Sequence, residues 1–339
     1  MKAIDLFSGC GGLTQGLKKA GFEVVGAVEN EPISIKTYKR NHREVNVSEG
    51  DIRKIEVSKL REQLKLQRGE LDLLAGCPPC QGFSSMKLLN GRKECSNPSN
   101  DLIFEFMRFV LEFKPKAIMI ENVPRLAKNY RLLSFINELT DLGYSSNKTI
   151  VNAVNHGIPQ ARKRMVLTAI LEADVDLSIQ NSNVTKTVHD AIGSMHEPGS
   201  GSDPLHDYKA NHSQKVERII QNIPKNGGSR SSLPTDLVLN CHKKTNGFKD
   251  VYGRMSWDKP SPTITGGCIN PSKGRFLHPE QNRAITLREA SMLQGFPKNY
   301  FFSLERGRYH AAQMIGNAFP PRFATHYALA IKDKLFQLQ

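Results

Sequence analysis

Short apolar runs alternate with amphipathic stretches over the first 170 residues of the 339-residue chain. Short apolar runs are typical of buried strands, and hydrophobic positions three and four residues apart are typical of helices. The alternation of the two predicts an α/β domain, a parallel sheet with helices on both faces. We expect strands at residues 3–7, 23–28, 45–47, 71–75, 117–120, 149–153 and 165–170, and helices near 13–20, 32–41, 57–67, 102–113 and 132–142, with Asp101 as the N-cap of the fourth helix.

The alternation stops near Leu171, and a less regular stretch follows. Residues 177–282 are rich in Ser, Asn, Gly, Pro and Lys and have few long apolar runs. We therefore expect a first domain at residues 1–176 and a smaller, irregular second domain at 177–282. Residues 283–304 are predicted to be a hinge and connecting helix that opens with a capping box at Thr286 and Glu289. Residues 305–339 are predicted to return to the first domain through a helix at 321–336.

The composition narrows the class of protein. The formal net charge is +14, from 47 basic and 33 acidic residues, which indicates a polyanionic partner, most simply nucleic acid. Six scattered cysteines fit a reducing compartment. The first residues already have a strand pattern and no apolar run is long enough to cross a bilayer. We therefore expect no signal peptide, no membrane segment and a cytoplasmic location.

The stretch that follows the strand at 71–75 carries a candidate nucleophile. Pro78 and Pro79 restrain the turn, so Cys80 lies on a restrained loop just past a strand end, where open α/β sheets carry their chemistry. Cys77 and Cys80 also form C-x-x-C, which occurs in redox pairs and zinc sites. Zinc needs a second close pair, and the other cysteines are far apart in sequence, so we expect no metal. A basic loop follows Cys80 and suggests a nucleophile that closes over an anionic substrate.

Two turns carry the signals of a nucleoside-binding site. The first strand leads into a glycine-rich turn, residues 7–12, and Glu29 ends the second strand, where an acidic residue can hold a ribose. The turn differs from the dinucleotide fingerprint, so NAD is not expected. Residues 50–52 follow the third strand, where Asp51 and Ile52 could hold an adenine ring.

Two further strand ends carry charged side chains. Glu121 ends the fifth strand and is a candidate general acid; the competing interpretation is a structural pair with an arginine. Arg162 and Arg164 precede the last strand on one side of the chain, where paired guanidinium groups suit a carbonyl or phosphate oxygen.

Together these motifs resemble the bacterial DNA (cytosine-5)-methyltransferase family over nearly the whole chain. The resemblance rests on DLFSGCGG (5–12), Glu29, GDI (50–52), PPCQ (78–81), ENV (121–123), QARKR (160–164), RAITLREA (283–290), QGFP (294–297) and GN (316–317). It implies a Rossmann-like S-adenosylmethionine-dependent methyltransferase domain with a smaller target-recognition domain. The implied reaction is methyl transfer from S-adenosylmethionine to C5 of a cytosine flipped out of a specific duplex DNA sequence.

The resemblance also implies roles for single residues. Cys80 would add to C6 of the cytosine, Glu121 would contact N3 and the amino group, and Arg164 with Arg162 would stabilise O2. The implied cofactor residues are Phe7, Gly9, Cys10, Gly11, Gly12, Glu29, Asn30, Asp51, Ile52, Pro79, Leu102, Asn317 and Ala318. The implied DNA contacts are Gln81, Ser84, Ser85, Lys87, Arg92, Arg254, Thr263 and Ile264.

The expected partners follow from this activity. We expect a monomer that acts on double-stranded DNA, either in restriction-modification, beside a cognate restriction endonuclease that forms no stable complex with it, or as an orphan enzyme. Two alternatives stay open at this point: a transfer-RNA cytosine-5 methyltransferase, which has the same motifs, and a catalytically silent DNA-binding module.

The distribution of charge predicts which part of the second domain faces DNA. Residues 171–224 hold 4 basic and 8 acidic residues, whereas residues 225–282 hold 9 basic and 4 acidic ones. Neutralising Lys243, Lys244, Lys249 or Arg254 should therefore weaken DNA binding, and removal of each phosphate contact should lower the salt slope by about one. Neutralising Lys186, Lys209, Lys215 or Arg218 should not. Binding titrations over a salt series test this hypothesis, and equal slopes for both sets of variants would reject it.

Overall fold

The computed structural model describes residues 1–79, 101–179, 181–208, 210–240 and 250–338. The chain forms two compact units, and neither is continuous in sequence. The first unit comprises Met1–Asn152, Lys163–Asn181 and Phe319–Gln339, and the second comprises Ala153–Arg162 and Ser182–Ala318. These boundaries differ from the four segments expected from composition, and the roles expected for those segments stay predictions.

Seven strands within the described residues form one sheet in the first unit. In chain order they are β1 (Lys2–Leu6), β2 (Glu23–Glu29), β3 (Asn46–Glu49), β4 (Leu73–Gly76), β5 (Ala117–Asn122), β6 (Tyr144–Asn152) and β7 (Lys163–Leu171), and their order in space is β3-β2-β1-β4-β5-β7-β6. Strands β1 to β5 pair in parallel, as the sequence predicted.

The prediction of a wholly parallel sheet is wrong for β7, which runs antiparallel to both β5 and β6. A parallel neighbour needs a long crossover connection, usually a helix. Between β6 and β7 the chain has only residues 153–162, which include the short 3-10 helix η4 (Ala153–His156). The strand therefore turns back beside β6 and enters the sheet in the opposite direction.

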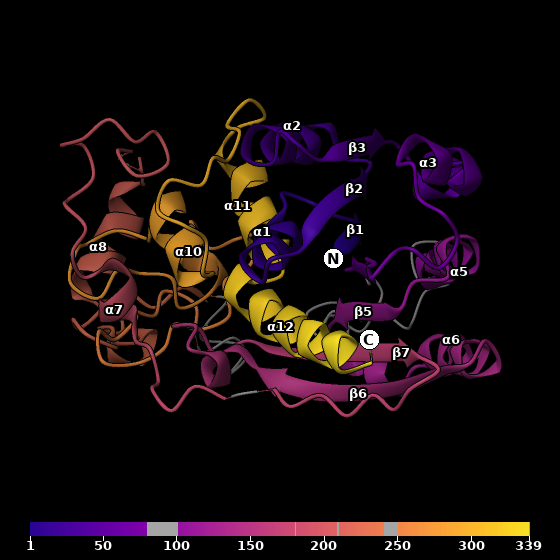
Figure 1. Ribbon diagram of the computed structural model, residues 1–339. Helices are drawn as coiled ribbons and strands as arrows, with labels where there is room; N and C mark the ends of the chain where they lie inside the picture. Colours follow the sequence, from indigo (N-terminus) through magenta and orange to yellow (C-terminus); the bar gives the residue numbers. More distant parts are fainter. Residues whose placement is uncertain (80–100, 180, 209, 241–249, 339) are drawn as a thin grey trace. The chain divides into compact units, whose positions relative to one another are not determined.

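Helices cover both faces of this sheet, as expected (Figure 1). On one face α3 (Val57–Gln63), α5 (Leu102–Phe113) and α6 (Tyr130–Asp141) pack their apolar side chains against alternate residues of β1, β4, β5 and β7. Asp5 lies between two of these residues in β1 and points to the other face, where Thr14 of α1 (Gly12–Lys19) donates to it. The C-terminal helix α12 (Pro321–Gln337) packs beside α1. The hydroxyl oxygen of Tyr327 in α12 lies 3.2 Å from Oγ1 of Thr149 in β6.

Most helix bounds agree with the expected ones, with two differences in detail. Helix α2 (Pro32–Asn41) and helix α5 have the predicted bounds. Helix α3 ends earlier than predicted, because Lys65 takes a left-handed conformation at φ 52°. Asp101 lies at the N-cap of α5, but no side-chain capping bond forms within the described residues, because its carboxylate accepts from Nε of Arg131 at 2.6 Å. Two 3-10 helices, η1 (Ile52–Lys54) and η3 (Pro124–Lys128), complete the described part of this unit.

The second unit has little regular structure, as its composition indicated. Its described elements are η4 (Ala153–His156), α7 (Val188–Ile192), α8 (Gln214–Asn222), η5 (Arg230–Ser232), η6 (Pro271–Lys273), α10 (Leu287–Leu293) and α11 (Arg308–Asn317). The predicted capping box of α10 is confirmed: Thr286 accepts from the backbone N–H of Glu289, and the Glu289 carboxylate accepts from that of Thr286. A small core forms around Ile219, Ile220, Leu237 and Leu277.

The packing of α1 against α12 leaves no room for a side chain at Gly16. A Cβ there would lie 2.4 Å from the carbonyl oxygen of Pro321 and 2.5 Å from Cβ of Ala324. Gly16→Ala should therefore lower the free energy of unfolding by about 1–3 kcal/mol, although alanine favours helices. The exposed Lys19→Ala in the same helix should stay within about 0.5 kcal/mol of wild type in urea unfolding. A Gly16→Ala protein as stable as wild type would show that the contact is loose.

Candidate active site

The predicted site residues of the first unit gather at one edge of the sheet, the carboxyl ends of its parallel strands. The glycine-rich turn follows β1, Glu29 ends β2, Asp51 follows β3, and Glu121 lies near the end of β5. Strands β1 and β4 are neighbours in the sheet. The chain runs outward from β1 through β2 and β3 on one side, and from β4 through β5 on the other. Such a point of reversal is where open α/β sheets bind ligands.

The glycine-rich turn is shaped by left-handed residues and fastened by Glu29. Phe7, Gly9 and Gly11 have φ angles of 58°, 54° and 90°. One oxygen of Glu29 accepts from the N–H of Gly9 at 2.7 Å, and the other accepts from the N–H groups of Asn30 and Glu31 at 2.9 and 2.8 Å. A Cβ at Gly9 would meet open space. The turn therefore leaves room for a ligand next to a carboxylate that still has acceptor capacity for a hydroxyl group.

Seven other residues predicted for the cofactor have different surroundings. Asp51 caps η1 and binds Arg53, whose side chain lowers the pKa of Asp51 to about 2. Ile52 is buried in the apolar core, and Asn30 is exposed. Cys10 is buried as well, and burial raises the pKa of its thiol to about 12. Gly12 is buried at the start of α1, and Pro79 and Leu102 are half-buried.

The turn after β4 is held from two sides. The N–H of Cys77 donates to the carbonyl of Leu6 in β1, and Nδ2 of Asn122 in β5 donates to the carbonyl of Pro78 at 2.8 Å. Cys80 and the predicted DNA contacts Gln81, Ser84, Ser85, Lys87 and Arg92 lie outside the described residues. The described part of this turn thus fixes where the chain leaves β4, two residues before Cys80 at Pro78.

Glu121 and Arg164 form a nearly buried ion pair at the same edge. Nε of Arg164 lies 2.8 Å from Oε1 of Glu121, with 15% and 9% of the two side chains exposed. Glu121 is opposite Val166 in the antiparallel β5–β7 pairing, and Arg164 lies two residues before Val166. Because β7 runs antiparallel, its first residues lie beside the carboxyl end of β5. In a parallel arrangement Arg164 would lie at the opposite edge of the sheet.

The Cys77 thiol lies close to this ion pair and differs from a nucleophile. Burial raises its pKa well above the ordinary value, and the nearby carboxylates of Glu121 and Asp5 raise it further. A thiol held in the protonated form is a weak nucleophile. These surroundings support Cys80 over Cys77 as the reactive cysteine.

The second unit contains Arg162, which the sequence paired with Arg164 as a substrate ligand. Its side chain is 2% exposed, and its guanidinium donates to the backbone carbonyls of Ile264, Gly316 and Ala318. These contacts correct the expectation that Arg162 faces substrate, because its Nη atoms are used within the protein.

One of the predicted DNA contacts in the described part of the second unit, Arg254, needs a similar correction. Arg254 is fully buried, and its guanidinium donates to Ile220, Ile223, His278, Gln281 and Asn282. A buried guanidinium with five acceptors cannot contact a phosphate, so the prediction for Arg254 is wrong. The Ile264 side chain is also fully buried, whereas Thr263 is half-buried and donates to the carbonyl of Ala161. Asn317 is exposed and Ala318 half-buried at the end of α11. Lys209, Lys243, Lys244 and Lys249 lie outside the described residues.

Sequence reasoning missed three positioning side chains. Asn122 holds the turn before Cys80, and the buried amides of Gln160 and Gln294 bond to each other at 2.6 Å. All three lie inside motifs on which the family resemblance rests, at residues 121–123, 160–164 and 294–297. For Asn122, a polar residue at the end of an apolar strand was the available signal.

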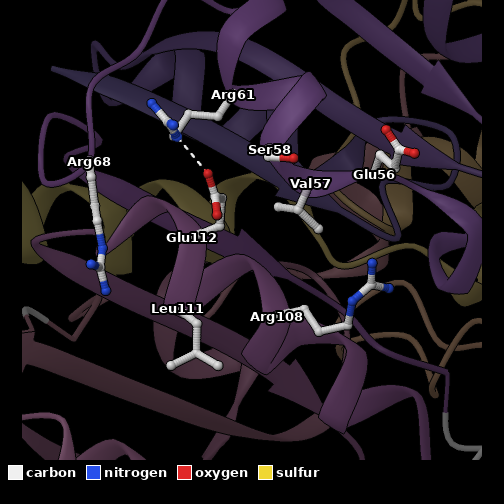
Figure 2. A pocket seen from close by; sticks show the side chains of 8 residues that line it. All are labelled: Glu56, Val57, Ser58, Arg61, Arg68, Arg108, Leu111 and Glu112. Atoms are coloured by element: carbon white, nitrogen blue, oxygen red, sulfur yellow. Dashed lines mark hydrogen bonds and ion pairs between the residues drawn. The ribbon is translucent and has the colours of Figure 1, made fainter.

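A surface hollow in the first unit is lined by residues of α3 and α5, together with Glu56 and Arg68. Its lining includes three arginines. Arg61 forms an ion pair with Glu112 (Figure 2). Arg108 forms an ion pair with Glu105, which is not part of the lining. The full lining is Glu56, Val57, Ser58, Arg61, Arg68, Arg108, Leu111 and Glu112. None of these residues was predicted to act on substrate or cofactor.

The described part of the chain lacks both a candidate metal site and a membrane-spanning helix. There is no cluster of three or more His, Cys, Asp or Glu side chains that could hold a metal ion. No helix in this part is long and apolar enough to cross a membrane.

Asp5 should make the stability of the protein depend on pH. Burial raises its pKa to about 7, and its bonds from Thr14 only partly oppose this. Because the folded-state pKa exceeds the unfolded value of about 3.9, the folded protein binds more protons between pH 4 and 7, and stability should fall as the pH rises through this window. Asp5→Asn should flatten that slope, by at most about 4 kcal/mol over the window.

Urea unfolding at several pH values measures this effect. The exposed Asp141→Asn serves as the control and should keep the wild-type slope. An unchanged slope in Asp5→Asn would show that Asp5 is ionised in the folded protein throughout this range.

Comparison with known proteins agrees with this geometry. The family model "C-5 cytosine-specific DNA methylase" matches residues 1–333. The Type II methylase M.HgiDII of Herpetosiphon aurantiacus is 37% identical over 97% of this chain and 94% of its own. The Type II methyltransferase M1.HphI of Haemophilus parahaemolyticus is 32% identical, over 97% and 86% of the two chains.

A solved structure of similar fold is a prophage-encoded DNA modification methyltransferase of E. coli. Its TM-score is 0.72 and its sequence identity 24%, over 99% of each chain. This likeness supports the methyltransferase fold of the seven-stranded sheet and its helices. Because the family model matches nearly the whole length of the chain, the chain belongs to the C-5 cytosine-specific DNA methylases and is a DNA (cytosine-5)-methyltransferase.

Proposed function

We propose that this methyltransferase modifies C5 of a cytosine flipped out of a specific duplex sequence, as the methylase of a type II restriction-modification system. The proposed route is a covalent bond between Sγ of Cys80 and C6 of the base. The observation that carries the proposal is the ion pair of Glu121 and Arg164, which lies at the strand edge from which the chain continues to Cys80. The names of the curated relatives support the restriction-modification role and disfavour transfer RNA as the substrate.

The residues around the glycine-rich turn fit S-adenosylmethionine as the cofactor. The open space at Gly9 admits a ligand against the backbone, and the Glu29 carboxylate can accept hydrogen bonds from ribose hydroxyls. When bound, S-adenosylmethionine supplies a methyl carbon attached to a positively charged sulfur. Phe7 would contact the adenine, with Asp51 and Ile52 at its edge, and Gly9, Gly11 and Gly12 would follow the methionine part.

The side chains of the protein activate the cytosine. The Cys80 thiolate adds to C6, and Glu121, which takes up a proton from solvent before this step, gives that proton to N3 as negative charge develops there. This addition ends the aromatic conjugation and makes C5 nucleophilic. Arg164 holds the Glu121 carboxyl group in place and stabilises the developing charge at O2. After methylation the C5 proton leaves to a base, the C6–S bond breaks, Cys80 departs as a thiolate, and N3 returns its proton to Glu121.

Transfer of labelled methyl groups tests the function directly. Duplex DNA, transfer RNA and a reaction without nucleic acid are compared, and labelled DNA is digested to identify the modified base. We expect label in 5-methylcytosine of duplex DNA. Label in transfer RNA alone would favour the alternative substrate, and no transfer to either would favour a silent DNA-binding module.

Cys80→Ser should abolish turnover and leave DNA binding largely intact, because serine cannot form the required adduct with C6. Wild-type protein should form a denaturation-resistant adduct with duplex DNA that carries 5-fluorocytosine, since fluorine cannot leave as a proton does. Peptide mapping should place this adduct on Cys80. Cys77→Ala is the matched control and should retain activity; an adduct on Cys77 would overturn the assignment.

Glu29→Ala should weaken binding of S-adenosylmethionine by roughly 1.5–3 kcal/mol, as expected when charge-assisted hydrogen bonds are removed. The substitution also frees the N–H groups of Gly9, Asn30 and Glu31, so part of the loss reflects a looser turn. Binding of DNA alone should change little. Calorimetry with each ligand decides the matter: equal losses for both would show that Glu29 acts only on the fold.

A further inference from the structure

Three buried polar side chains of the second unit connect segments that are far apart in sequence. Gln160, Arg162 and Gln294 are 0%, 2% and 0% exposed. Their bonds join residues 160–162, 261–264, 293–294 and 316–318. We refer to these three side chains and their bonds as the amide–guanidinium network.

Gln160 uses both ends of its amide. Its Nε2 donates to Oε1 of Gln294 at 2.6 Å and to the carbonyl of Leu293 at 3.2 Å. Its Oε1 accepts from the backbone N–H of Ile264 at 2.9 Å. Gln160 therefore links the end of α10 to the segment that contains Thr263 and Ile264.

Gln294 and Arg162 extend the network to the end of α11. Nε2 of Gln294 donates to the carbonyl of Ala318 at 2.6 Å. Arg162 donates through Nη1 to the carbonyl of Ile264 at 3.0 Å and through Nη2 to those of Gly316 and Ala318 at 3.0 and 3.2 Å. Both backbone groups of Ile264 and the carbonyl of Ala318 are thus held by the same three side chains.

The burial of these groups makes the network directional and hard to replace. A buried donor or acceptor that loses its partner costs the full desolvation penalty, so each amide must keep its orientation. A displacement at residues 316–318 is therefore transmitted to Ile264 through Arg162 directly and through Gln294 and Gln160 in series. The two segments are constrained to move together.

We propose that Gln160, Arg162 and Gln294 are positioning residues that couple cofactor binding at residues 317–318 to engagement of the target cytosine at residues 263–264. The proposal depends on the proposed function and on the family resemblance, which implies cofactor contacts at Asn317 and Ala318 and DNA contacts at Thr263 and Ile264. Arg162 acts in this account through the backbone it holds and does not touch the substrate. A ligand that orders one segment strengthens binding at the other, and the effect is reciprocal.

The test measures how S-adenosylhomocysteine, the unreactive product, changes the affinity for a synthetic duplex. The recognition site in that duplex is first mapped from 5-methylcytosine in DNA of cells that express the protein. The ratio of the two dissociation constants, without and with S-adenosylhomocysteine, is the coupling factor. We expect roughly 5–150 for wild type, the usual range of such couplings, and a value near one for Gln294→Met, which keeps the length of the side chain and loses its amide.

Gln294→Glu provides a readout that a purely structural role would not move. A protonated carboxyl can accept from Gln160 and donate to Ala318 as the amide does, whereas a carboxylate cannot donate. Burial favours the protonated form, so the coupling factor of Gln294→Glu should approach the wild-type value at low pH and fall as the pH rises. The wild-type ratio, measured at the same pH values, should change less. This comparison also covers the case in which Gln294→Met does not fold.

Arg254→Met is the matched control, because Arg254 is an equally buried arginine of the same unit whose acceptors lie outside the network. It should lower stability in urea unfolding and keep the coupling factor. A wild-type coupling factor in Gln294→Met, or in Gln294→Glu at every pH, would overturn the proposal. Independent binding of the two ligands to wild type would also overturn the proposal but would leave the proposed function intact. Absence of S-adenosylhomocysteine binding would contradict the proposed function itself.

Discussion

The ion pair between Glu121 and Arg164 depends on the direction of one strand. Parallel strands bring their carboxyl ends to one edge of the sheet, so a residue that precedes a strand normally lies at the far edge. Strand β7 runs antiparallel to β5, which places its first residues beside the last residues of β5. The short connection at residues 153–162 enforces this direction. A feature of chain connectivity therefore brings together an acid and a base that are 43 positions apart in sequence.

The other parts of the first-unit site are held by hydrogen bonds to the backbone. Glu29 accepts three N–H groups around the glycine-rich turn, and Asn122 fixes the turn that leads to Cys80. Such bonds orient a site before any ligand arrives, which reduces the ordering that binding must impose. The pKa of the half-buried Cys77 beside this turn is raised above its ordinary value, so proximity to the site does not by itself make a cysteine reactive.

The sequence predicted the elements of the first unit well, because burial of apolar runs and helix periodicity are local signals. It also predicted Glu29 at the end of the second strand and the capping box of Thr286. It failed where the outcome depends on tertiary contacts. The antiparallel direction of β7 follows from a connection without a crossover helix. Arg254 and Arg162 are buried because folding brings backbone carbonyls from distant parts of the sequence within reach of their guanidinium groups. Residue type indicates that an arginine needs acceptors, but it does not distinguish a phosphate from a carbonyl.

We propose that Glu121 and Arg164 act on the cytosine as one unit. Single-turnover methyl transfer to duplex DNA, measured for Glu121→Gln, Arg164→Met and the double variant, tests it directly. Residues that act as a unit give strongly non-additive losses. If the two side chains act as one unit, the methyl-transfer rate of the double variant should fall about as far as that of the worse single variant. Losses that multiply would contradict it, because they would show that the two side chains contribute independently.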